Sequence, residues 1–309
     1  MEFKKYDSLE NAYRQKFVDA CQNLGIQDWV ATVKVHGANF GFISDGTDVT
    51  PFKRTSVIGK NPDTSMYEFY GCNDVVERYR DKIVQMCFSI GGGETVYVYG
   101  ELYGQGVQKE INYGQKDFII FDIKVGNSWL TWDEVNYMAE KFGLPVVPEL
   151  GRGTLQEMLE ISPEFVCPLS PTGDRSEGLV IKPLTDADMM LPTGSRPIVK
   201  NKSKAFSEKK HREPKKPYSV PAHLQKLVKD FSQYLNENRL SNVLSKIDRT
   251  TITQKDFGKV LGMLIQDAKE EFERDEYEIS KDDWKGVGKS VNKIAGEVLR
   301  KEWLNILDG

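Results

Sequence analysis

The sequence predicts an α+β fold with mainly antiparallel sheets and flanking helices, followed by a small all-α C-terminal domain. Over the first 200 residues, runs rich in Val, Ile, Tyr and Phe, typical of strands, alternate with segments of helical apolar spacing. After Pro214, Pro217 and Pro221 the strand signal is lost and helical spacing with many Lys and Glu residues continues. We therefore expect one domain over residues 1–217, ending in a basic hinge, and a helical domain over residues 218–309.

Each element is predicted from its own local pattern. The expected strands are 29–35, 39–43, 95–102, 117–125, 177–182 and 197–202. Helical spacing predicts helices over 8–24 and 74–90, and over 222–238, 254–277 and 281–307 in the C-terminal part. Capping boxes at Thr131–Glu134 and Thr154–Glu157 predict the starts of two more helices, the first of which ends near Gly143.

The composition excludes several classes of protein. With 309 residues, of which 39% are hydrophobic and 28% charged, the chain is too long for a single small binding module. No apolar run approaches the length of a membrane span and the N-terminus has no apolar signal region, so we expect a cytoplasmic protein with no membrane partner. Four widely spaced cysteines and three histidines make a zinc site improbable.

The charge is unevenly distributed along the chain. The net charge is −4, yet residues 196–217 hold nine basic and two acidic side chains, a local charge of +7. Such a segment is typical either of a polyanion-binding site or of a solvated lysine-rich linker.

Lys34 occupies the most informative position in the sequence. It lies between Val33 and Val35, just before Gly37, so that alternation places it with Thr32 and His36 on one strand face while the valines anchor the other. An amine held at the end of a buried strand can act as a nucleophile. A solvated lysine at a strand end would give the same local pattern.

Three further clusters could each serve a nucleotide, and each also has an ordinary structural explanation. Arg54 could bind ribose or phosphate oxygens, or be solvated. Glu101 lies on a predicted strand rich in tyrosine, where Gly100 and Gly104 would leave room for a ligand. Its carboxylate could accept hydrogen bonds from ribose hydroxyls or hold a metal, or it could simply face water. Phe121, next to Asp122, could stack on a purine or belong to the core.

A fourth cluster is harder to explain as ordinary structure. Lys182, Lys200 and Lys202 lie on two apolar strands beside Glu177. Burying ammonium groups is costly unless an anion compensates them, so these lysines favour a phosphate-binding function.

The order and spacing of the clusters resemble the covalent nucleotidyltransferase superfamily, which contains nucleic-acid ligases and messenger-RNA capping enzymes. In the order of motifs I, III, IIIa, IV and V, the matching elements are Lys34-x-x-Gly37, Glu101, Phe121-Asp122, Glu177 to Lys182, and Lys200-x-Lys202. His36, Asn39, the Lys53-Arg54-Thr55 element and the segment after Lys200 are similar to the RNA ligase 2 family of phages and kinetoplastid editing ligases. One departure is Val33, where phage-type members often carry glutamate.

The resemblance implies a nucleotidyltransferase domain and an ATP-dependent RNA ligase that works through lysyl-AMP on Lys34 and an RNA-adenylate. Its substrate would be RNA with 3′-hydroxyl and 5′-phosphate ends, foremost nicks in duplex RNA. Its cofactors would be ATP and Mg²⁺ or Mn²⁺, and we expect a monomer. The alternatives are a GTP-dependent capping guanylyltransferase or a DNA ligase of the same superfamily, and a non-catalytic RNA-binding protein.

The resemblance also implies roles for individual residues. The catalytic residues would be Lys34, Glu177, Lys182, Lys200 and Lys202. The nucleotide would be bound by these lysines with Val33, Arg54, Glu101 and Phe121, and the metal by Glu177 and Glu101. His36, Asn39 and Asp122 would orient the phosphate or the RNA end. RNA would be bound by the helical domain and by the basic hinge that ends the first domain, through Lys204, Lys209, Lys210, Arg212, Lys215 and Lys216.

Overall fold

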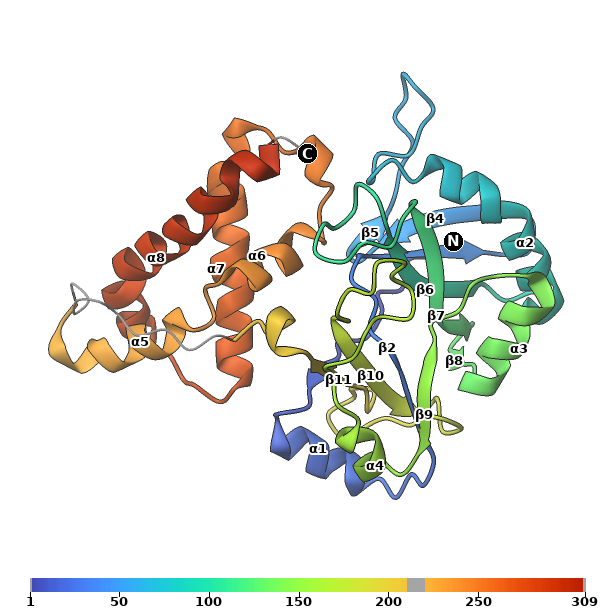
Figure 1. Cartoon of the computed structure of the whole chain (residues 1–309), viewed down its shortest axis with the longest axis horizontal. Helices are drawn as coiled ribbons and strands as arrows, with labels where there is room; N and C mark the ends of the chain where they lie inside the picture. Colours follow the sequence, from blue (N-terminus) through green and yellow to red (C-terminus); the bar gives the residue numbers. More distant parts are fainter. Residues whose placement is uncertain (1, 210–219, 308–309) are drawn as a thin grey trace. The chain divides into compact units, whose positions relative to one another are not determined.

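The computed structural model describes residues 2–209 and 220–307, and the chain divides into two compact units, Met1–Ala205 and Phe206–Gly309 (Figure 1). The first unit mixes helices and strands, and the second is helical throughout its described residues. The α+β class with a helical C-terminal region is therefore confirmed. The predicted boundary between residues 217 and 218 lies outside the described residues and stays a prediction.

Two sheets form the frame of the first unit. The five-stranded sheet has the order β1 (Glu10–Asn11), β11 (Val199–Lys202), β10 (Gly178–Pro183), β2 (Trp29–Val33), β9 (Glu149–Gly153). The six-stranded sheet has the order β5 (Ser56–Val57), β4 (Val49–Lys53), β3 (Ala38–Ser44), β6 (Val96–Tyr103), β7 (Asp117–Val125), β8 (Ser128–Trp129). All neighbours pair antiparallel except β1 with β11, so the predicted antiparallel character is confirmed.

Helices cover the outer faces of these sheets. The helices of the first unit are α1 (Gln15–Gln22), α2 (Asn73–Gly91), α3 (Trp132–Phe142) and α4 (Leu155–Glu160), with a 3₁₀ turn at Lys204–Phe206. Side chains of α1 and α4 share a core cluster with Ala31, Leu179 and Ile181 of the five-stranded sheet. Thr131 and Thr154 close the two predicted capping boxes, and Gly143 ends α3 in the left-handed conformation, as the sequence indicates.

Alternation along β10 explains how an apolar strand carries a lysine. Leu179 and Ile181 pack against α1 and α4, so Val180 and Lys182 point to the opposite face. Val180 packs there with Tyr97 and Tyr99 of the six-stranded sheet. The layer between the two sheets is therefore where the charged side chains of β10 and β11 lie.

The second unit packs its helices around one apolar core. It contains α5 (Gln225–Ser232), α6 (Glu237–Leu244), α7 (Phe257–Arg274) and α8 (Lys281–Leu307), with 3₁₀ turns at Ala222–Leu224, Arg249–Thr251 and Gln254–Asp256. The core is lined by Phe231, Leu264, Phe272, Val291 and Leu299 among others. Among the described residues, no helix combines the length and the apolar composition that a membrane span requires.

Two sequence-based predictions about helices are wrong, and several strands were not predicted. The expected helix over 8–24 begins only at Gln15, because Glu10 and Asn11 pair with β11 instead. The expected helix over 222–238 is divided, because Asn236 accepts from the Arg239 N–H and caps a separate helix, α6. Strands β4, β5, β8 and β9 were not predicted; β5 and β8 span two residues each, and such short runs carry little periodic signal.

Candidate active site

Lys34 follows the last residue of β2, in the position that the sequence indicated. Its backbone N–H donates to the Gly178 carbonyl at 2.9 Å, so the register with β10 continues one residue beyond the strand. Val33 is buried, and by alternation its side chain lies on the opposite face from Lys34. Packing of β2 thus holds the Lys34 amine on the face that β10 and β11 share.

Glu177 is the centre of the charged cluster around Lys34. Its Oε1 lies 2.9 Å from Lys34 Nζ and 2.8 Å from Lys202 Nζ, and its side chain is only 4% exposed. Burial alone would raise the pKa of Glu177, but Lys202, Lys34 and His36 together hold it well below the usual value. The carboxylate is therefore ionised across the physiological range and joins two of the predicted lysines.

His36 lies between two carboxylates. Its Nδ1 is 3.5 Å from Glu177 Oε2, and its Nε2 is 2.9 Å from Glu110 Oε2. Burial lowers the pKa of the imidazole, but hydrogen bonds and charges from Glu110 and Glu177 outweigh burial and raise it above the ordinary value. The cationic form of His36 is thus favoured in this site.

Gly37 allows the turn between Lys34 and β3 to pass directly against β6. A Cβ atom at this position would lie 2.2 Å from the Leu102 carbonyl oxygen and 2.9 Å from Glu101 Cγ. Glu101 is paired in register with Asn39 of β3, so these two predicted site residues lie side by side. Desolvation raises the pKa of Glu101 to about 7, with the Lys34 charge opposing that shift and the Glu177 charge adding to it.

Gly100 in β6 and Gly104 just after it have a different role from the expected one. A Cβ at Gly100 would lie 2.2 Å from the Ile119 carbonyl oxygen, and one at Gly104 would lie 2.3 Å from the Gln115 carbonyl oxygen. These glycines make room for neighbouring backbone, so the expectation that they admit a ligand is corrected.

A second charged cluster surrounds Asp122. Its carboxylate, 1% exposed, contacts Lys182 Nζ at 3.2 Å and Arg196 at 2.9 Å, and accepts a hydrogen bond from the Tyr6 hydroxyl at 2.9 Å. Burial opposes ionisation, but Lys182 and Arg196 lower the pKa of Asp122. Burial also lowers the pKa of Lys182, whose Nζ donates to the Phe121 carbonyl at 2.6 Å and lies 4.5 Å from the centre of the Trp132 ring.

A β-bulge explains the orientation of Phe121 and Asp122. In the pairing of β6 with β7, Tyr99 is opposite Asp122 and Gly100 is opposite Ile120, so Phe121 is the extra residue. Tyr6 contacts both side chains, with ring centres 4.9 Å apart for Phe121, which shows that the two point to the same side. A strictly alternating strand would have separated them.

Two other predicted residues are placed near these clusters. Arg54 follows β4 and donates to the Tyr6 carbonyl at 3.2 Å and to the Ser8 hydroxyl at 3.4 Å. Lys200 lies on β11 opposite Val180 of β10 and is half-buried. The structure therefore gathers Lys34, His36, Glu177 and Lys202 by direct contact, and gathers Lys182 with Asp122 in a separate group.

Comparisons with known proteins assign this arrangement to a family. A family model described as RNA ligase matches residues 27–202, which contain both clusters. The chain belongs to the RNA ligase family. A second family model, described as T4 RNA ligase 2 C-terminal, matches residues 219–297, so the expected RNA ligase 2 branch and the enzyme class are also confirmed.

Individual relatives of this RNA ligase agree with the family. The chain is 24% identical to the RNA-editing ligase 2, mitochondrial, of Trypanosoma brucei brucei, over 88% of this chain and 83% of that one. The apo form of a Naegleria gruberi RNA ligase mutant has a TM-score of 0.51 and 18% identity, covering 66% of this chain and 56% of that one. The Naegleria RNA ligase with PPi has a TM-score of 0.50 and the same identity, and 57% of it is covered. The chain thus spans less than two thirds of these solved structures, which support the nucleotidyltransferase fold.

The carboxylates of this RNA ligase do not form a preformed metal cage. Within the described residues, no group of three or more His, Cys, Asp or Glu side chains is arranged to hold a metal ion. Glu177 and Glu101 are nonetheless suitable oxygen donors, because Mg²⁺ is commonly bound by one or two carboxylates together with substrate phosphates. A divalent cation would also offset the desolvation that raises the pKa of Glu101.

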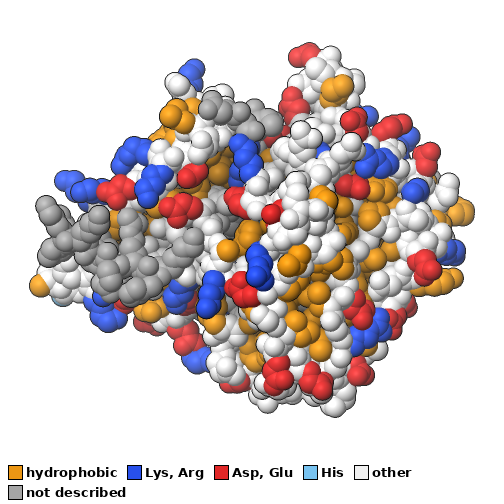
Figure 2. All heavy atoms as spheres, in the orientation of Figure 1, with side chains coloured by type: hydrophobic (Ala, Val, Ile, Leu, Met, Phe, Trp, Pro, Cys, Tyr) orange, Lys and Arg blue, Asp and Glu red, His pale blue; other side chains and the backbone are white. Residues whose placement is uncertain are grey.

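Several basic side chains of the segment 196–217 form ion pairs with carboxylates, which lowers the positive charge that the segment presents. Arg196 and Lys202 pair with Asp122 and Glu177, and Lys209 pairs with Asp275 at 3.0 Å, while Lys204 is exposed. Lys210, Arg212, Lys215 and Lys216 lie outside the described residues. On the face shown in Figure 2, the described Lys and Arg side chains are interspersed with Asp and Glu.

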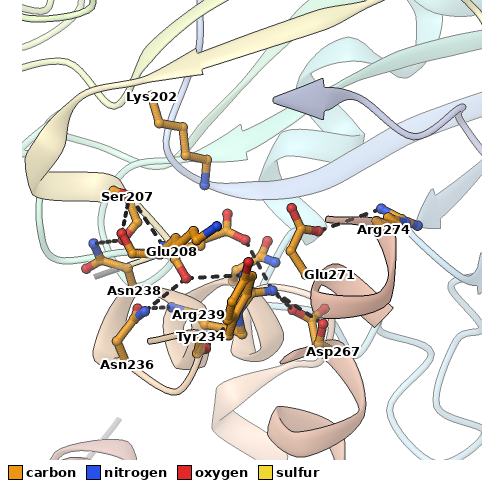
Figure 3. Close-up of polar contacts among 12 residues, drawn as sticks. Lys202, Ser207, Glu208, Tyr234, Asn236, Asn238, Arg239, Asp267, Glu271 and Arg274 are labelled. Atoms are coloured by element: carbon orange, nitrogen blue, oxygen red, sulfur yellow. Dashed lines mark hydrogen bonds and ion pairs between the residues drawn. The ribbon is translucent and has the colours of Figure 1, made fainter. Parts of the chain in front are cut away.

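The start of the second unit is fixed by a buried arginine. Arg239 donates to the carbonyl groups of Tyr234 and Glu208 and contacts Asp267 Oδ2 at 2.8 Å (Figure 3). Asn236 and Asn238 donate to the carbonyls of Glu208 and Ser207 at 2.9 and 2.8 Å. Residues 207 and 208 therefore pack with the helices of the second unit.

Several residues of the site were not singled out in the sequence. Arg196 was counted only as part of the basic segment, although period-2 spacing places it on the same face as Lys200 and Lys202. Tyr6 and Glu110 lie in segments without regular secondary structure, so no periodic pattern marked them. Their roles depend on contacts with residues far away in the sequence.

Proposed function

We propose that this chain is an ATP-dependent RNA ligase that forms lysyl-AMP on Lys34 and seals RNA 3′-hydroxyl and 5′-phosphate ends, foremost nicks in duplex RNA. The observation that carries the proposal is the Lys34 amine, fixed at the end of β2 and sharing the Glu177 carboxylate with Lys202. This pair of cations lies within the region matched by the RNA ligase family. The T4 RNA ligase 2 C-terminal match supports an RNA ligase over a capping enzyme or a DNA ligase.

The first step is a phosphoryl-group transfer from ATP to Lys34. The neutral amine attacks the α-phosphorus, an N–P bond forms, and the bond to the pyrophosphate oxygen breaks. Glu177 is a weak base because its pKa is held well below the ordinary value. Its contribution is therefore to orient the amine at 2.9 Å, and the proton that the amine loses passes to solvent water.

The neighbouring lysines stabilise the charge that develops on the phosphate. Lys202, bound to the same carboxylate, and Lys200 on the same strand face would contact the phosphate oxygens. Lys182 is held by Asp122, and the charged partner that contacts Lys34 is the Glu177 carboxylate. Asp122 is proposed to act by holding Lys182, together with Arg196 and Tyr6.

Glu177 and Glu101 are the residues that would hold Mg²⁺ or Mn²⁺. When bound, the ion would neutralise charge on the phosphate oxygens. We assign Phe121 to stacking on adenine, and Arg54, Glu101 and the backbone of Val33 to the remainder of the nucleotide, because the Val33 side chain lies on the opposite face from Lys34. His36 and Asn39, which flank Gly37, would orient the phosphate or the RNA end.

The later steps return Lys34 to its starting state. An oxygen of the RNA 5′-phosphate attacks the lysyl-AMP phosphorus, the N–P bond breaks, and the RNA carries AMP. The 3′-hydroxyl oxygen then attacks the 5′-phosphate, a phosphodiester forms, and AMP leaves. Lys204, Lys209 and the basic residues up to Lys216 would bind the RNA phosphates. A monomer located in the cytoplasm remains the expectation.

The test is covalent labelling with α-labelled ATP or GTP and a divalent cation, followed by a chase with nicked RNA, single-stranded RNA or nicked DNA. We expect an acid-labile adduct with ATP that nicked RNA discharges, and no adduct on Lys34→Ala. Adduct formation with GTP alone would favour a capping enzyme. RNA binding without any adduct would favour the non-catalytic alternative.

The contribution of the basic segment is tested separately. Neutralising Lys209, Lys210, Lys215 and Lys216 is expected to leave labelling unchanged while RNA binding weakens and its salt dependence becomes shallower. A filter-binding series over several salt concentrations measures both effects. An unchanged salt slope would contradict the assignment of these residues.

A further inference from the structure

The loop between β6 and β7 closes on itself next to the turn at residues 34–37, which follows β2. We call residues 104–114 the strap. Its base is closed where the Gln105 N–H donates to the Gly114 carbonyl at 3.0 Å. Gly104, at a φ of +93°, makes this closure possible, because a Cβ there would lie 2.3 Å from the Gln115 carbonyl oxygen.

Three side chains of the strap bind the turn that follows Lys34. Gln108 donates to the Gly37 carbonyl at 3.3 Å, and the Tyr113 hydroxyl accepts from the His36 N–H at 3.0 Å. Glu110 Oε2 lies 2.9 Å from His36 Nε2. Gln108 and Tyr113 are buried, so the strap satisfies polar backbone groups of the turn that lie away from water.

The strap is also tied to the segment that leads to Glu177. The Asn112 N–H donates to Asp174 Oδ2 at 2.8 Å, three residues before Glu177. His36 completes the connection on the other side, with Nδ1 at 3.5 Å from Glu177 Oε2. The strap therefore bridges the two segments that carry the Lys34 amine and its carboxylate partner.

Glu110 is the closer of the two partners of the imidazole and fixes the orientation of its ring. A histidine ring turns freely about its side-chain torsions unless hydrogen bonds at its nitrogens select one orientation. The 2.9 Å contact with Glu110 makes that selection, and directs Nδ1 to Glu177. Glu110 itself is 45% exposed, and a pair with one exposed partner contributes little to stability.

We propose that Glu110 is a positioning residue of the ligase, and that the strap sets the rate of AMP transfer by holding His36 against Glu177. The inference rests on the proposed ligase activity. Glu110 does not need to touch the nucleotide, because it acts through His36. Gln108 and Tyr113 hold the backbone of the same turn, so the strap constrains both the ring and the peptide next to Lys34.

The test separates the rate constant from the fraction of active enzyme. Single-turnover labelling by ATP, and discharge of purified enzyme-adenylate by nicked RNA, are each measured for the full chain and for Glu110→Ala and Glu110→Gln. Glu140→Gln, an exposed glutamate on α3, is the matched control. Thermal unfolding is recorded for every variant.

We expect Glu110→Ala to lower the rate constant of labelling or of discharge about tenfold. The labelled fraction, the half-saturating ATP concentration and the unfolding temperature should stay unchanged. Glu110→Gln retains an acceptor oxygen and should recover part of the loss, while Glu140→Gln should match the wild type. A purely structural effect would instead lower the labelled fraction. Unchanged rate constants in both steps for Glu110→Ala would overturn the inference, whereas an unlabelled wild type would overturn the proposed function itself.

Discussion

Replacing Asp122 by asparagine is expected to destabilise the first unit more than any surface charge substitution. The Asp122, Lys182 and Arg196 side chains are 1%, 5% and 2% exposed, so the variant would leave two buried cations without their carboxylate. Breaking a buried ion pair by removing one partner typically costs about 3–5 kcal/mol. For a unit of this size, that corresponds to a fall in Tm of roughly 6–20 °C.

The matched control is Asp133→Asn. Asp133 contacts Arg152 at 2.8 Å, but these side chains are 59% and 42% exposed. Exposed pairs of this kind contribute about 0–1 kcal/mol. The same chemical change should therefore have a small effect at this site.

Tryptophan fluorescence during urea and thermal unfolding provides the assay. Trp129 reports on the cluster directly, because the Arg196 guanidinium lies 3.8 Å from the centre of its ring. Adding Lys182→Met to Asp122→Asn should restore part of the lost stability, since one uncompensated charge is removed. Equal stability of Asp122→Asn and Asp133→Asn would refute the reasoning that burial makes this cluster costly to break.

Two further predictions concern the strand next to the nucleophile. Desolvation raises the pKa of Glu101 to about 7, so the carboxylate that we propose as a cation ligand forms as pH rises through that value. The Mg²⁺ concentration for half-maximal labelling should therefore fall as pH rises. Glu101→Gln should lose this pH dependence in its residual activity, and a dependence that persists in the variant would assign it to another group. Gly37→Ala places a Cβ 2.2 Å from the Leu102 carbonyl oxygen and should cost about 1–3 kcal/mol of stability and most of the labelling rate. Gly59→Ala, with no atom within 4 Å of its added Cβ, is the control, and equal behaviour of the two variants would contradict the close-approach argument.

Much of the local structure was predictable because it depends on near neighbours in the sequence. The capping boxes at Thr131 and Thr154 each require only four consecutive residues. Alternation was sufficient to place Lys34 on the opposite strand face from Val33. The errors arose where a distant partner decided the outcome, as when β11 paired with Glu10 and Asn11 and shortened the expected first helix.

The sequence by itself determined that Lys34 shares a strand face with Thr32 and His36, and that Lys200 shares one with Lys202, because period-2 spacing fixes which side chains of a strand lie on the same face. Only the tertiary structure decided which charges pair: Lys34 and Lys202 with Glu177, and Lys182 and Arg196 with Asp122. These pairings depend on strand register and on the bulge at Phe121, and the contact of Glu110 with His36 depends on the strap. Such contacts join residues that are tens of positions apart, and no local pattern encodes them.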